Sequence, residues 1–452
     1  MARAKKETAL TPEERLQAAL VPDWERPYKL PENWCWTTVG AINQYVGISA
    51  DPTKAKNKTF ELYSVPSSAD NYPEIVLGAD IGSTKQSVKK GDVLLCKINP
   101  RINRVWKVSK YTDHSLLASS EWIVIRNSGL ISNYLMWCFR SPYFRGYMLS
   151  NVSGVGGSLM RAQPKFVQGY PVPVPPLAEQ QRIVDRIESL FAKLDEAKEK
   201  AQAVVDSFET RKAAILHKAF TGELTAKWRK EHDVGMESWE KYKFNELGTL
   251  ERGRSKHRPR NDPKLFGGKY PFIQTGDVAR SGMYITEHTQ TLSEVGAEQS
   301  KLFPKGTLCI TIAANIGDVS ILTYDCCFPD SVVGFTPNER TLSEYIYYLM
   351  STLQREIEAN APATAQKNIN LRILNDLQLD IPSVAEQTQI VNQVEYLFFQ
   401  EQHAKEAAEA VLEQIDLMKK SILARAFRGE LGTNDPSEES AVELLKEIIR
   451  RG

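Results

Sequence analysis

Apolar residues recur at alternating intervals of three and four along two long stretches of the chain. The first set is Ile183, Ile187, Leu190, Leu194, Ala197, Ala201, Val204, Phe208 and Ile215, and the second is Ile390, Val394, Leu397, Ala404, Ala408, Val411, Ile415, Met418 and Ile422. This spacing places each set on one side of a helix and is typical of a coiled-coil seam. We therefore predict two long amphipathic helices, the second of which has its seam interrupted once, at Glu401.

The two predicted helices belong to a repeat whose copies lie 207 positions apart. Residues 174–184 read VPPLAEQQRIV and residues 381–391 read IPSVAEQTQIV, while AFTGEL at 219–224 is echoed by AFRGEL at 426–431. Prolines precede both helices and glycines follow them, as is usual where a helix begins and ends. Loops change length at little cost, so the equal spacing of the two phrases in both copies indicates that the helix length itself matters.

The stretches that precede the two helices, residues 31–173 and 230–380, have mixed patterns. In the first, the runs from Asp92 to Ile98 and from Glu121 to Ile125 predict strands, and the aromatic segment from Tyr134 to Tyr147 predicts a helix. The second stretch repeats the order of these elements. We therefore expect two α/β modules with one fold and diverged surfaces.

The expected fold class is α+β, with two α/β modules separated by two long helices. The domains are an N-terminal arm (1–30) with a short helix capped by Thr11, a first module (31–173), a first helix region (174–229), a second module (230–380), and a second helix region with a C-terminal tail (381–452). A helix of about 40 residues is about 60 Å long, and the natural partner of each helix is the other one. Antiparallel packing would hold the modules at opposite ends, related by a pseudo-twofold axis. A plain hairpin that only joins two domains is the alternative.

Composition limits the class of protein. Hydrophobic content is 42%, and the longest apolar runs, such as Cys309 to Ala314, fall far short of the roughly 20 residues of a membrane span. No apolar signal segment follows the basic residues from Met1 to Lys6. The six cysteines lack CxxC spacing, which is typical of reduced thiols, so we expect a cytoplasmic protein without a zinc site.

The net charge of +1 conceals an uneven distribution. Residues 31–170 hold 16 Lys and Arg against 9 Asp and Glu, whereas residues 231–380 hold 16 against 20. The segment from Arg252 to Arg260 nevertheless carries five positive charges and no negative one. Basic patches on a near-neutral chain fit a DNA-binding protein whose other surfaces bind protein partners.

With this layout the chain resembles the specificity subunits of type I restriction-modification systems. The resemblance rests on PPLAEQQRIV (175–184) and its echo at 382–391, on AFTGELT (219–225) and AFRGEL (426–431), and on LPENW (30–34). It covers nearly the whole chain, and the duplicated arrangement is more specific than any single motif. It implies two target-recognition domains that each bind one half of a split double-stranded DNA sequence, held apart by helices that set the gap.

The resemblance also implies partners and cofactors. Two methyltransferase (M) subunits that bind S-adenosylmethionine and methylate adenine at N6 would dock on the helices. Motor-nuclease (R) subunits that use ATP and Mg²⁺ would cut unmethylated DNA. The specificity subunit would have no catalytic centre, would bind no cofactor or metal itself, and would act in the cytoplasm of a bacterium or archaeon. The alternatives are a smaller system with a fused methyltransferase-nuclease partner, and a coiled-coil scaffold that never touches DNA.

The sequence motifs of the corresponding enzymes are missing. An N6-adenine methyltransferase needs an Asp/Asn-Pro-Pro-Tyr/Phe motif, and Asn99-Pro100-Arg101-Ile102 lacks the second proline and the aromatic residue. There is no GxxxxGK phosphate loop, and the glycines from Gly154 to Gly157 predict a flexible loop. The sequence therefore favours a chain without chemistry of its own.

Candidate DNA-binding residues lie in basic loops of both modules. In the second module they are Arg252, Arg254, Lys256, His257, Arg258 and Arg260, followed by Lys269, Gln274 and Thr275. In the first module they are Lys54, Lys56 and Lys58 in one loop, and Lys97, Arg101, Arg104 and Lys107 in another. Arginine suits both phosphate contact and bidentate contact to guanine, and Gln274 and Thr275 are candidate base readers. A solvated run of charge is the alternative for each loop.

The segments just before the two helix regions align at the same offset of 207 positions. They add Arg161, Gln163, Lys165, Gln366, Lys367 and Asn368 as residues that we expect to face a DNA groove. Phosphate contacts would dominate affinity and base contacts would set the sequence recognised. Because the modules differ in sequence, we expect two different half-sites with a fixed gap, on a duplex whose helical repeat is about 34–36 Å.

Overall fold

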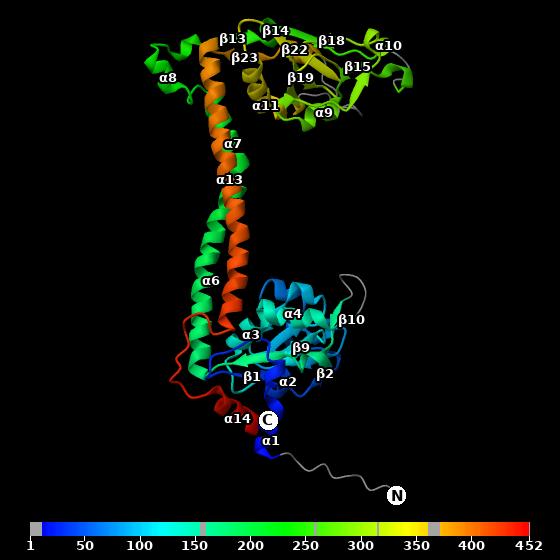
Figure 1. The fold of residues 1–452 in the computed structure, drawn as a ribbon. Helices are drawn as coiled ribbons and strands as arrows, with labels where there is room; N and C mark the ends of the chain where they lie inside the picture. Colours follow the sequence, from blue (N-terminus) through cyan, green and yellow to red (C-terminus); the bar gives the residue numbers. More distant parts are fainter. Residues whose placement is uncertain are drawn as a thin grey trace. The chain divides into compact units, whose positions relative to one another are not determined.

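The structure is a computed structural model that describes residues 11–153, 160–256, 259, 261–313, 316–359 and 371–451, without the side chains of residues 354–359. It divides into two compact units, which Figure 1 shows as ribbons. The first unit consists of Met1–Ala201 and Ala410–Gly452, and the second is the continuous segment Gln202–Glu409. Each unit therefore contains one module and part of both long helices.

In its described residues the first unit contains sheets of five, three, two and two strands. Its strands are β1 (Cys35–Thr38), β2 (Ser49–Ala50), β3 (Thr59–Tyr63), β4 (Glu74–Leu77), β5 (Lys85–Ser87), β6 (Val93–Cys96), β7 (Val105–Lys107), β8 (Ser115–Ala118), β9 (Trp122–Ile125), β10 (Val152–Ser153), β11 (Arg161–Ala162) and β12 (Pro171–Val174). The strand orders are β2-β5-β8-β3-β4, β7-β6-β9, β1-β12 and β10-β11. All pairs are antiparallel except β3 with β8.

The three-stranded sheet of the first unit is buried on both faces. Successive residues of β6 point to opposite sides, so Val93 and Leu95 join the large core with the helices, while Leu94 and Cys96 join a second core with Tyr63. The helices are α1 (Pro12–Ala19), α2 (Val39–Ile42), α3 (Ser132–Arg140), α4 (Pro142–Ser150), α5 (Pro164–Val167) and α14 (Ala441–Arg451), together with parts of α6 (Leu177–Asp206) and α13 (Val384–Ala426). The predicted helix between Tyr134 and Tyr147 is thus two helices, α3 and α4, that meet at Ser141.

The second unit has the same kind of build. Its strands are β13 (Glu240–Lys243), β14 (Gly248–Arg252), β15 (Phe266–Phe272), β16 (Tyr284–Ile285), β17 (Gln290–Leu292), β18 (Leu302–Phe303), β19 (Leu308–Thr311), β20 (Val319–Leu322), β21 (Cys326–Cys327), β22 (Val332–Pro337) and β23 (Gln378–Ile381). Its helices are α7 (Phe208–Phe220), α8 (Ala226–Glu231), α9 (Thr275–Arg280), α10 (Glu294–Glu298), α11 (Ser343–Ala359) and α12 (Leu371–Asn375), with part of α13. The strand orders are β14-β22-β19-β20-β16, β17-β15-β21-β18 and β13-β23.

Equivalent aromatic contacts fasten each module to the end of a long helix. In the first unit the rings of Tyr134 and Phe427 meet edge to face at 5.4 Å, and in the second unit those of Tyr345 and Phe220 do so at the same distance. The Tyr134 hydroxyl donates to the carbonyl of Pro173, and the Tyr345 hydroxyl donates to the carbonyl 207 positions further on. The two modules therefore share one fold where they meet the helices, as predicted.

The long helices pack side by side and antiparallel within each unit. In the second unit the Lys405 ammonium lies 4.8 Å from the Phe208 ring centre, and Arg211 pairs with Glu401 at 2.5 Å. Residue numbers fall along α13 as they rise along α7, which confirms the predicted direction. The interruption of the second seam at Glu401 is thus explained, because its carboxylate faces an arginine of the neighbouring helix.

Two predicted seam positions in the last part of α13 are wrong, although Ile415 between them is 3% exposed. Val411 and Met418, which the spacing places in the seam, are 45% and 49% exposed. Lys419 lies against the neighbouring helix instead, where it binds Asp195 and its ammonium sits 5.1 Å from the Phe191 ring centre. Lys419 thus occupies the contact position that the spacing gives to Met418.

The first long helix is also interrupted, although the apolar spacing predicts one rod. The helix α6 ends at Asp206 and α7 begins at Phe208, whereas α13 is unbroken over 43 residues. The Ser207 hydroxyl between them donates to the carbonyls of Ala203 and Val204. Such back-bonding by serine competes with the regular helix pattern and bends helices.

The arm and the tail pack against each other in the first unit. Thr11 caps the helix α1, as predicted, and its contact with Glu14 completes a capping box. Leu16 and Ala19 are the buried residues of this helix. Leu445 and Ile448 of α14 belong to the same apolar core. Figure 1 shows the two helices side by side.

Candidate nucleic-acid interface

The repeated Ala-Glu-Gln phrase anchors each module to the start of its long helix. Gln180 and Gln387 are fully buried. The Gln180 side-chain oxygen accepts from the backbone N–H of Ile131 at 2.9 Å, and that of Gln387 accepts from Leu342 at 3.0 Å. Each amide nitrogen also donates to the carbonyl of the proline five residues earlier. The glutamine therefore holds the first turn of the long helix, the strand before it and the module together.

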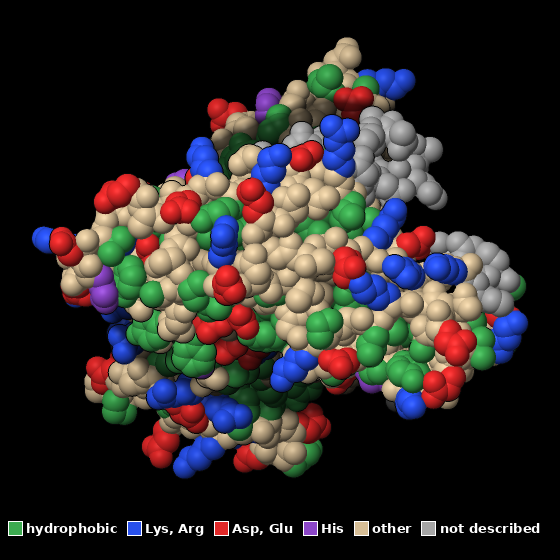
Figure 2. Space-filling model, turned by 90° about the horizontal axis from the view of Figure 1, so that it is seen from above, with side chains coloured by type: hydrophobic (Ala, Val, Ile, Leu, Met, Phe, Trp, Pro, Cys, Tyr) green, Lys and Arg blue, Asp and Glu red, His purple; other side chains and the backbone are tan. Residues whose placement is uncertain are grey.

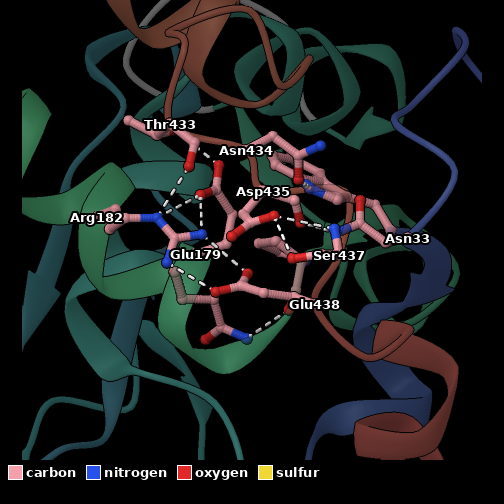
Figure 3. A network of polar contacts seen from close by, with 11 residues as sticks. Asn33, Glu179, Arg182, Thr433, Asn434, Asp435, Ser437 and Glu438 are labelled. Carbon is pink, nitrogen blue, oxygen red and sulfur yellow. Dashed lines mark hydrogen bonds and ion pairs between the residues drawn. The ribbon is translucent and has the colours of Figure 1, made fainter.

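The glutamate of the same phrase closes a polar network in the first unit (Figure 3). Glu179 is fully buried and accepts from the Thr433 hydroxyl at 2.6 Å and from Arg182 at 2.9 Å. Arg182 also binds both carboxylate oxygens of Glu438, at 2.7 and 2.8 Å. Burial raises the pKa of Glu179, against the effect of these hydrogen bonds, while the hydrogen bonds to Glu438 raise the pKa of Arg182. The network ties the tail to the start of α6.

The equivalent glutamate of the second unit has different partners. Glu386 is fully buried and accepts from Arg229 at 2.5 Å, from the Thr225 hydroxyl at 2.7 Å and from the Trp239 indole at 3.1 Å. Arg229 is itself only 7% exposed. Both networks hold chain segments together at the start of a long helix, with Glu179 and Glu386 at equivalent positions.

The first basic loop of the first module is solvent-facing. Lys54, Lys56 and Lys58 are all exposed, and the Lys54 ammonium is 3.9 Å from Asp51. The loop is held at its end, because Gly78 donates its backbone N–H to the Lys58 carbonyl at 2.8 Å. Three ammonium groups on a supported loop suit contact to a phosphate backbone.

The structure brings together two other sets of candidate residues in the first module. Lys97 accepts at its carbonyl from the backbone of Ala162, so the hairpin between β6 and β7 lies beside the segment that carries Arg161. Arg161 pairs with Glu121 at 2.6 Å. The remaining candidates of these sets are Arg101, Arg104, Gln163 and Lys165, which are exposed or partly exposed, and Lys107, whose ammonium donates to Asn133 at 2.5 Å.

In the second module Arg254 and Gln274 line one cavity of about 190 Å³, together with Phe266 and Phe272. Gln274 caps α9, whose first residue is the other candidate base reader, Thr275, and its amide donates to Gln290 at 2.7 Å. Arg252 donates to the carbonyl of Asp330, and Lys256 is exposed. Lys269 points to Glu294 at 3.0 Å, and this hydrogen bond raises the pKa of Lys269. His257, Arg258, Arg260, Gln366, Lys367 and Asn368 lie outside the described residues.

Charge on the surface is mixed. Seen from above (Figure 2), cationic and anionic side chains are intermingled over much of the visible face, and several Lys and Arg side chains gather near its right-hand edge. This pattern agrees with a near-neutral chain that carries local basic patches.

The groups that support the hairpin between β6 and β7 were not predicted from the sequence. The guanidinium of Arg145 donates to the Arg101 carbonyl, and the Asn103 amide donates to the Arg140 carbonyl at 3.1 Å. The exposure of Ile102, which is 53%, was not predicted either. These contacts join residues about 40 positions apart, so no local pattern signals them.

Within the described ranges, no group of three or more His, Cys, Asp or Glu side chains is placed to hold a metal ion. The described helices also include none that is long and apolar enough to cross a membrane. All six cysteines are free and buried.

Comparison with known proteins gives a consistent result. The family described as the type I restriction modification DNA specificity domain matches residues 47–205 and 236–411. The specificity subunit of the type I restriction enzyme EcoKI from Escherichia coli K12 is 24% identical over 93% of this chain and 96% of its own length. That of MjaIX from Methanocaldococcus jannaschii is 28% identical over 37% of this chain and 40% of its own length. The crystal structure of the HsdS subunit from Thermoanaerobacter tengcongensis superposes with a TM-score of 0.67 at 21% identity, over 90% of this chain and all of that chain, which supports the fold.

Proposed function

Because the chain belongs to the family of type I restriction-modification DNA specificity domains, we propose that its first module (31–173) and its second module (230–380) each bind one half of a split DNA target. Its role is DNA sequence specificity, and it directs a modification and restriction complex instead of catalysing a reaction. The observation that carries the proposal is the pairing of two unlike modules with one repeated frame. Gln180 and Gln387 make the same contacts in both units, whereas the basic loops differ.

The exposed cations of the modules supply the DNA contact in this proposal. In the first module they surround the β6–β7 hairpin and the loop of Lys54, Lys56 and Lys58. In the second they follow β14, where Arg254 lies beside Gln274 at one cavity. Phosphate contacts from such loops would give a strongly salt-dependent affinity. Different side chains at the two places would read different bases, which makes the target asymmetric.

The paired helices set the gap between the half-sites in this proposal. Support comes from their antiparallel packing in each unit and from the equal spacing of the repeated phrases. Removal of four residues from both helix regions, about 6 Å of helix, should change the gap or abolish binding without changing either half-site. An unchanged gap with intact binding would show that the helices are not a ruler.

The helices also dock two methyltransferase subunits in this proposal, one on each unit. Exposed apolar side chains on α13 support it, because Tyr396 and Phe399 are 63% and 59% exposed in the second unit, and Leu417 and Met418 are 54% and 49% exposed in the first. A similar structure, with a TM-score of 0.67 at 22% identity, comes from a study of complex assembly in a type I system. S-adenosylmethionine, ATP and Mg²⁺ would be bound by the methyltransferase and motor-nuclease partners, in the cytoplasm.

The test is expression of the chain with its methyltransferase partner, followed by mapping of N6-methylated adenines across a genome. Two short constant blocks separated by a fixed gap are expected. Swapping the second module for one from a relative should change one block and leave the other unchanged. Methylation without a bipartite sequence, or none at all with a stable complex, would refute the proposal. A single co-purifying chain with both methyltransferase and nuclease activity would assign the smaller, fused type of system.

A further inference from the structure

The turn between β6 and β7 of the first module is held rigidly. Its short helix Pro100–Ile102 is flanked by Asn99 and Asn103, both in the left-handed region with φ of 47° and 52°. Asparagine tolerates this conformation better than most residues, but it is uncommon outside glycine. Two such residues in one turn fix the direction in which its tip points.

Three neighbouring segments lock the turn in place. The Asn99 N–H donates to the Met160 carbonyl at 2.9 Å, and the Asn103 amide donates to the Arg140 carbonyl at 3.1 Å. The guanidinium of Arg145 donates to the Arg101 carbonyl. Hydrogen bonds thus join the turn to α3, to α4 and to the residue just before β11, and they fix the position of its tip. Local strain of this kind tends to persist where the surrounding structure serves a function.

An exposed aliphatic side chain stands in this turn, next in sequence to the exposed Arg101. Ile102 is 53% exposed, and in the part of the chain that the structure describes it belongs to none of the apolar cores. Residues 97–107 carry four Lys or Arg and no Asp or Glu. The fold therefore gains little from an isoleucine at this position, whereas a negatively charged ligand with an apolar feature would contact it.

The connection between β19 and β20 in the second module is different. Its two isoleucines, Ile312 and Ile316, are 0% and 6% exposed. Among the residues that the structure describes in the two connections, an exposed isoleucine is thus found in the first module, as expected for a residue that distinguishes one half-site from the other.

We propose that this turn enters the DNA major groove and that Ile102 contacts the 5-methyl group of a thymine in the half-site bound by the first module. The inference rests on the proposed function. The major groove is about 12 Å wide, which admits a two-stranded ribbon, and the thymine methyl is its one apolar feature. The cations beside Ile102 would hold the turn on the phosphates on either side. A half-site that is methylated on adenine contains an A·T pair, so a thymine methyl is always available.

The test uses the chain in complex with its methyltransferase subunits and duplexes that carry its mapped target. Each thymine of the half-site is replaced in turn by deoxyuridine, which lacks only the methyl group. One replacement should weaken binding of the wild-type complex about three- to ten-fold, the effect of one lost methyl contact. The Ile102→Ala complex should bind the unmodified duplex as weakly as the wild-type complex binds the deoxyuridine duplex, and that replacement should not weaken its binding further. The Ile102→Val complex should remain sensitive to the replacement.

Ile75→Ala is the matched control, because Ile75 is also exposed, at 43%, and lies on the strand β4 of the same module. It should bind as the wild type does and keep the same sensitivity. Ile102→Ala with full sensitivity, or a wild-type complex indifferent to every replacement, overturns the inference and leaves the proposed function intact. A wild-type complex that binds no bipartite target refutes the proposed function itself.

Discussion

Arg211 and Glu401 form an ion pair of 2.5 Å between α7 and α13, at the point where Glu401 interrupts the predicted apolar seam of α13. Their side chains are 31% and 23% exposed. A half-buried pair of this kind selects one register between two helices, because any shift leaves both charges facing apolar neighbours.

Glu401→Ala should therefore lower the stability by about 1–2 kcal/mol, between the values of exposed and buried pairs. Removing both charges in R211M/E401L should recover most of this loss. The control is Asp195→Ala, which breaks the more exposed pair with Lys419 and should cost less than about 0.5 kcal/mol. Calorimetric unfolding measures all three, and equal losses for the two single variants would show that burial does not distinguish the pairs.

Gly429 should tolerate no side chain. It has φ of 75°, and a Cβ there would overlap the Pro31 ring. Gly429→Ala should thus lower the stability by about 1–2 kcal/mol, the cost of an alanine in the left-handed region. The overlap with Pro31 adds a steric cost. Gly432→Ala is the matched control, because Gly432 has φ of 70° with open space around it. Thermal unfolding should show a clearly larger drop in Tm for Gly429→Ala, and equal drops would contradict the close packing of Gly429 against Pro31.

Arg229 should be the more sensitive of the two network arginines. It is 7% exposed and bound to the fully buried Glu386, so Arg229→Ala leaves a buried carboxylate without its cation and should cost about 3–5 kcal/mol. Arg182→Ala leaves Glu179 with the hydroxyl of Thr433 and opens its own site to water, since the Arg182 side chain is 38% exposed. Urea unfolding should therefore give a larger loss for Arg229→Ala, and the reverse order would refute this interpretation.

Glu179 should make stability depend on pH. Burial raises its pKa above the ordinary 4.5, so the folded protein binds this proton at higher pH than the unfolded chain does. The stability it contributes is complete below about 4.5 and falls as pH rises through the raised pKa. Glu179→Gln stays neutral, so the Tm of the wild type relative to this variant should decrease from pH 4.5 towards pH 7. A difference that is constant or increases over this range would show that the carboxylate is not penalised by burial.

The thiols should be unreactive in the folded protein. All six are buried, and burial raises the pKa of Cys35 and Cys326 to about 12. The thiolate is the reactive form, so both access and ionisation oppose reaction. A colorimetric thiol reagent at pH 8 should label almost none of them in the native state and all six after denaturation. Rapid labelling of a thiol in the native state would show that its unit opens locally.

The long helices were predictable because their signals are local and repeated. Three-four spacing predicted both helices, and the duplicated phrases marked where they begin, but the anchoring role of Gln180 and Gln387 came only from the structure. The break at Ser207 and the contact of Lys419 with α6 were not predictable. The Ser207 hydroxyl bonds to a carbonyl of its own helix, whereas Lys419 binds a carboxylate of the neighbouring helix. Apolar spacing carries no information on such choices.

The candidate interface was predictable only as a set of basic loops. Composition indicates where cations gather, but not that Lys107 reaches Asn133 or that Arg161 reaches Glu121. The exposure of Ile102 required the folded turn, because an isoleucine after a buried strand otherwise predicts core. Loop conformation is set by distant contacts, so it is the part of the fold that sequence patterns describe least.

The first unit is assembled from two segments separated by the whole of the second unit. During synthesis, Gln202–Glu409 can fold as soon as it leaves the ribosome, since all of its segments are contiguous. The first unit must wait, because Glu179 obtains Thr433 only when translation is almost complete. The first unit is therefore the first to be synthesised and the last to complete its fold. A product truncated before Thr433 would contain a folded second unit and an incompletely folded first unit.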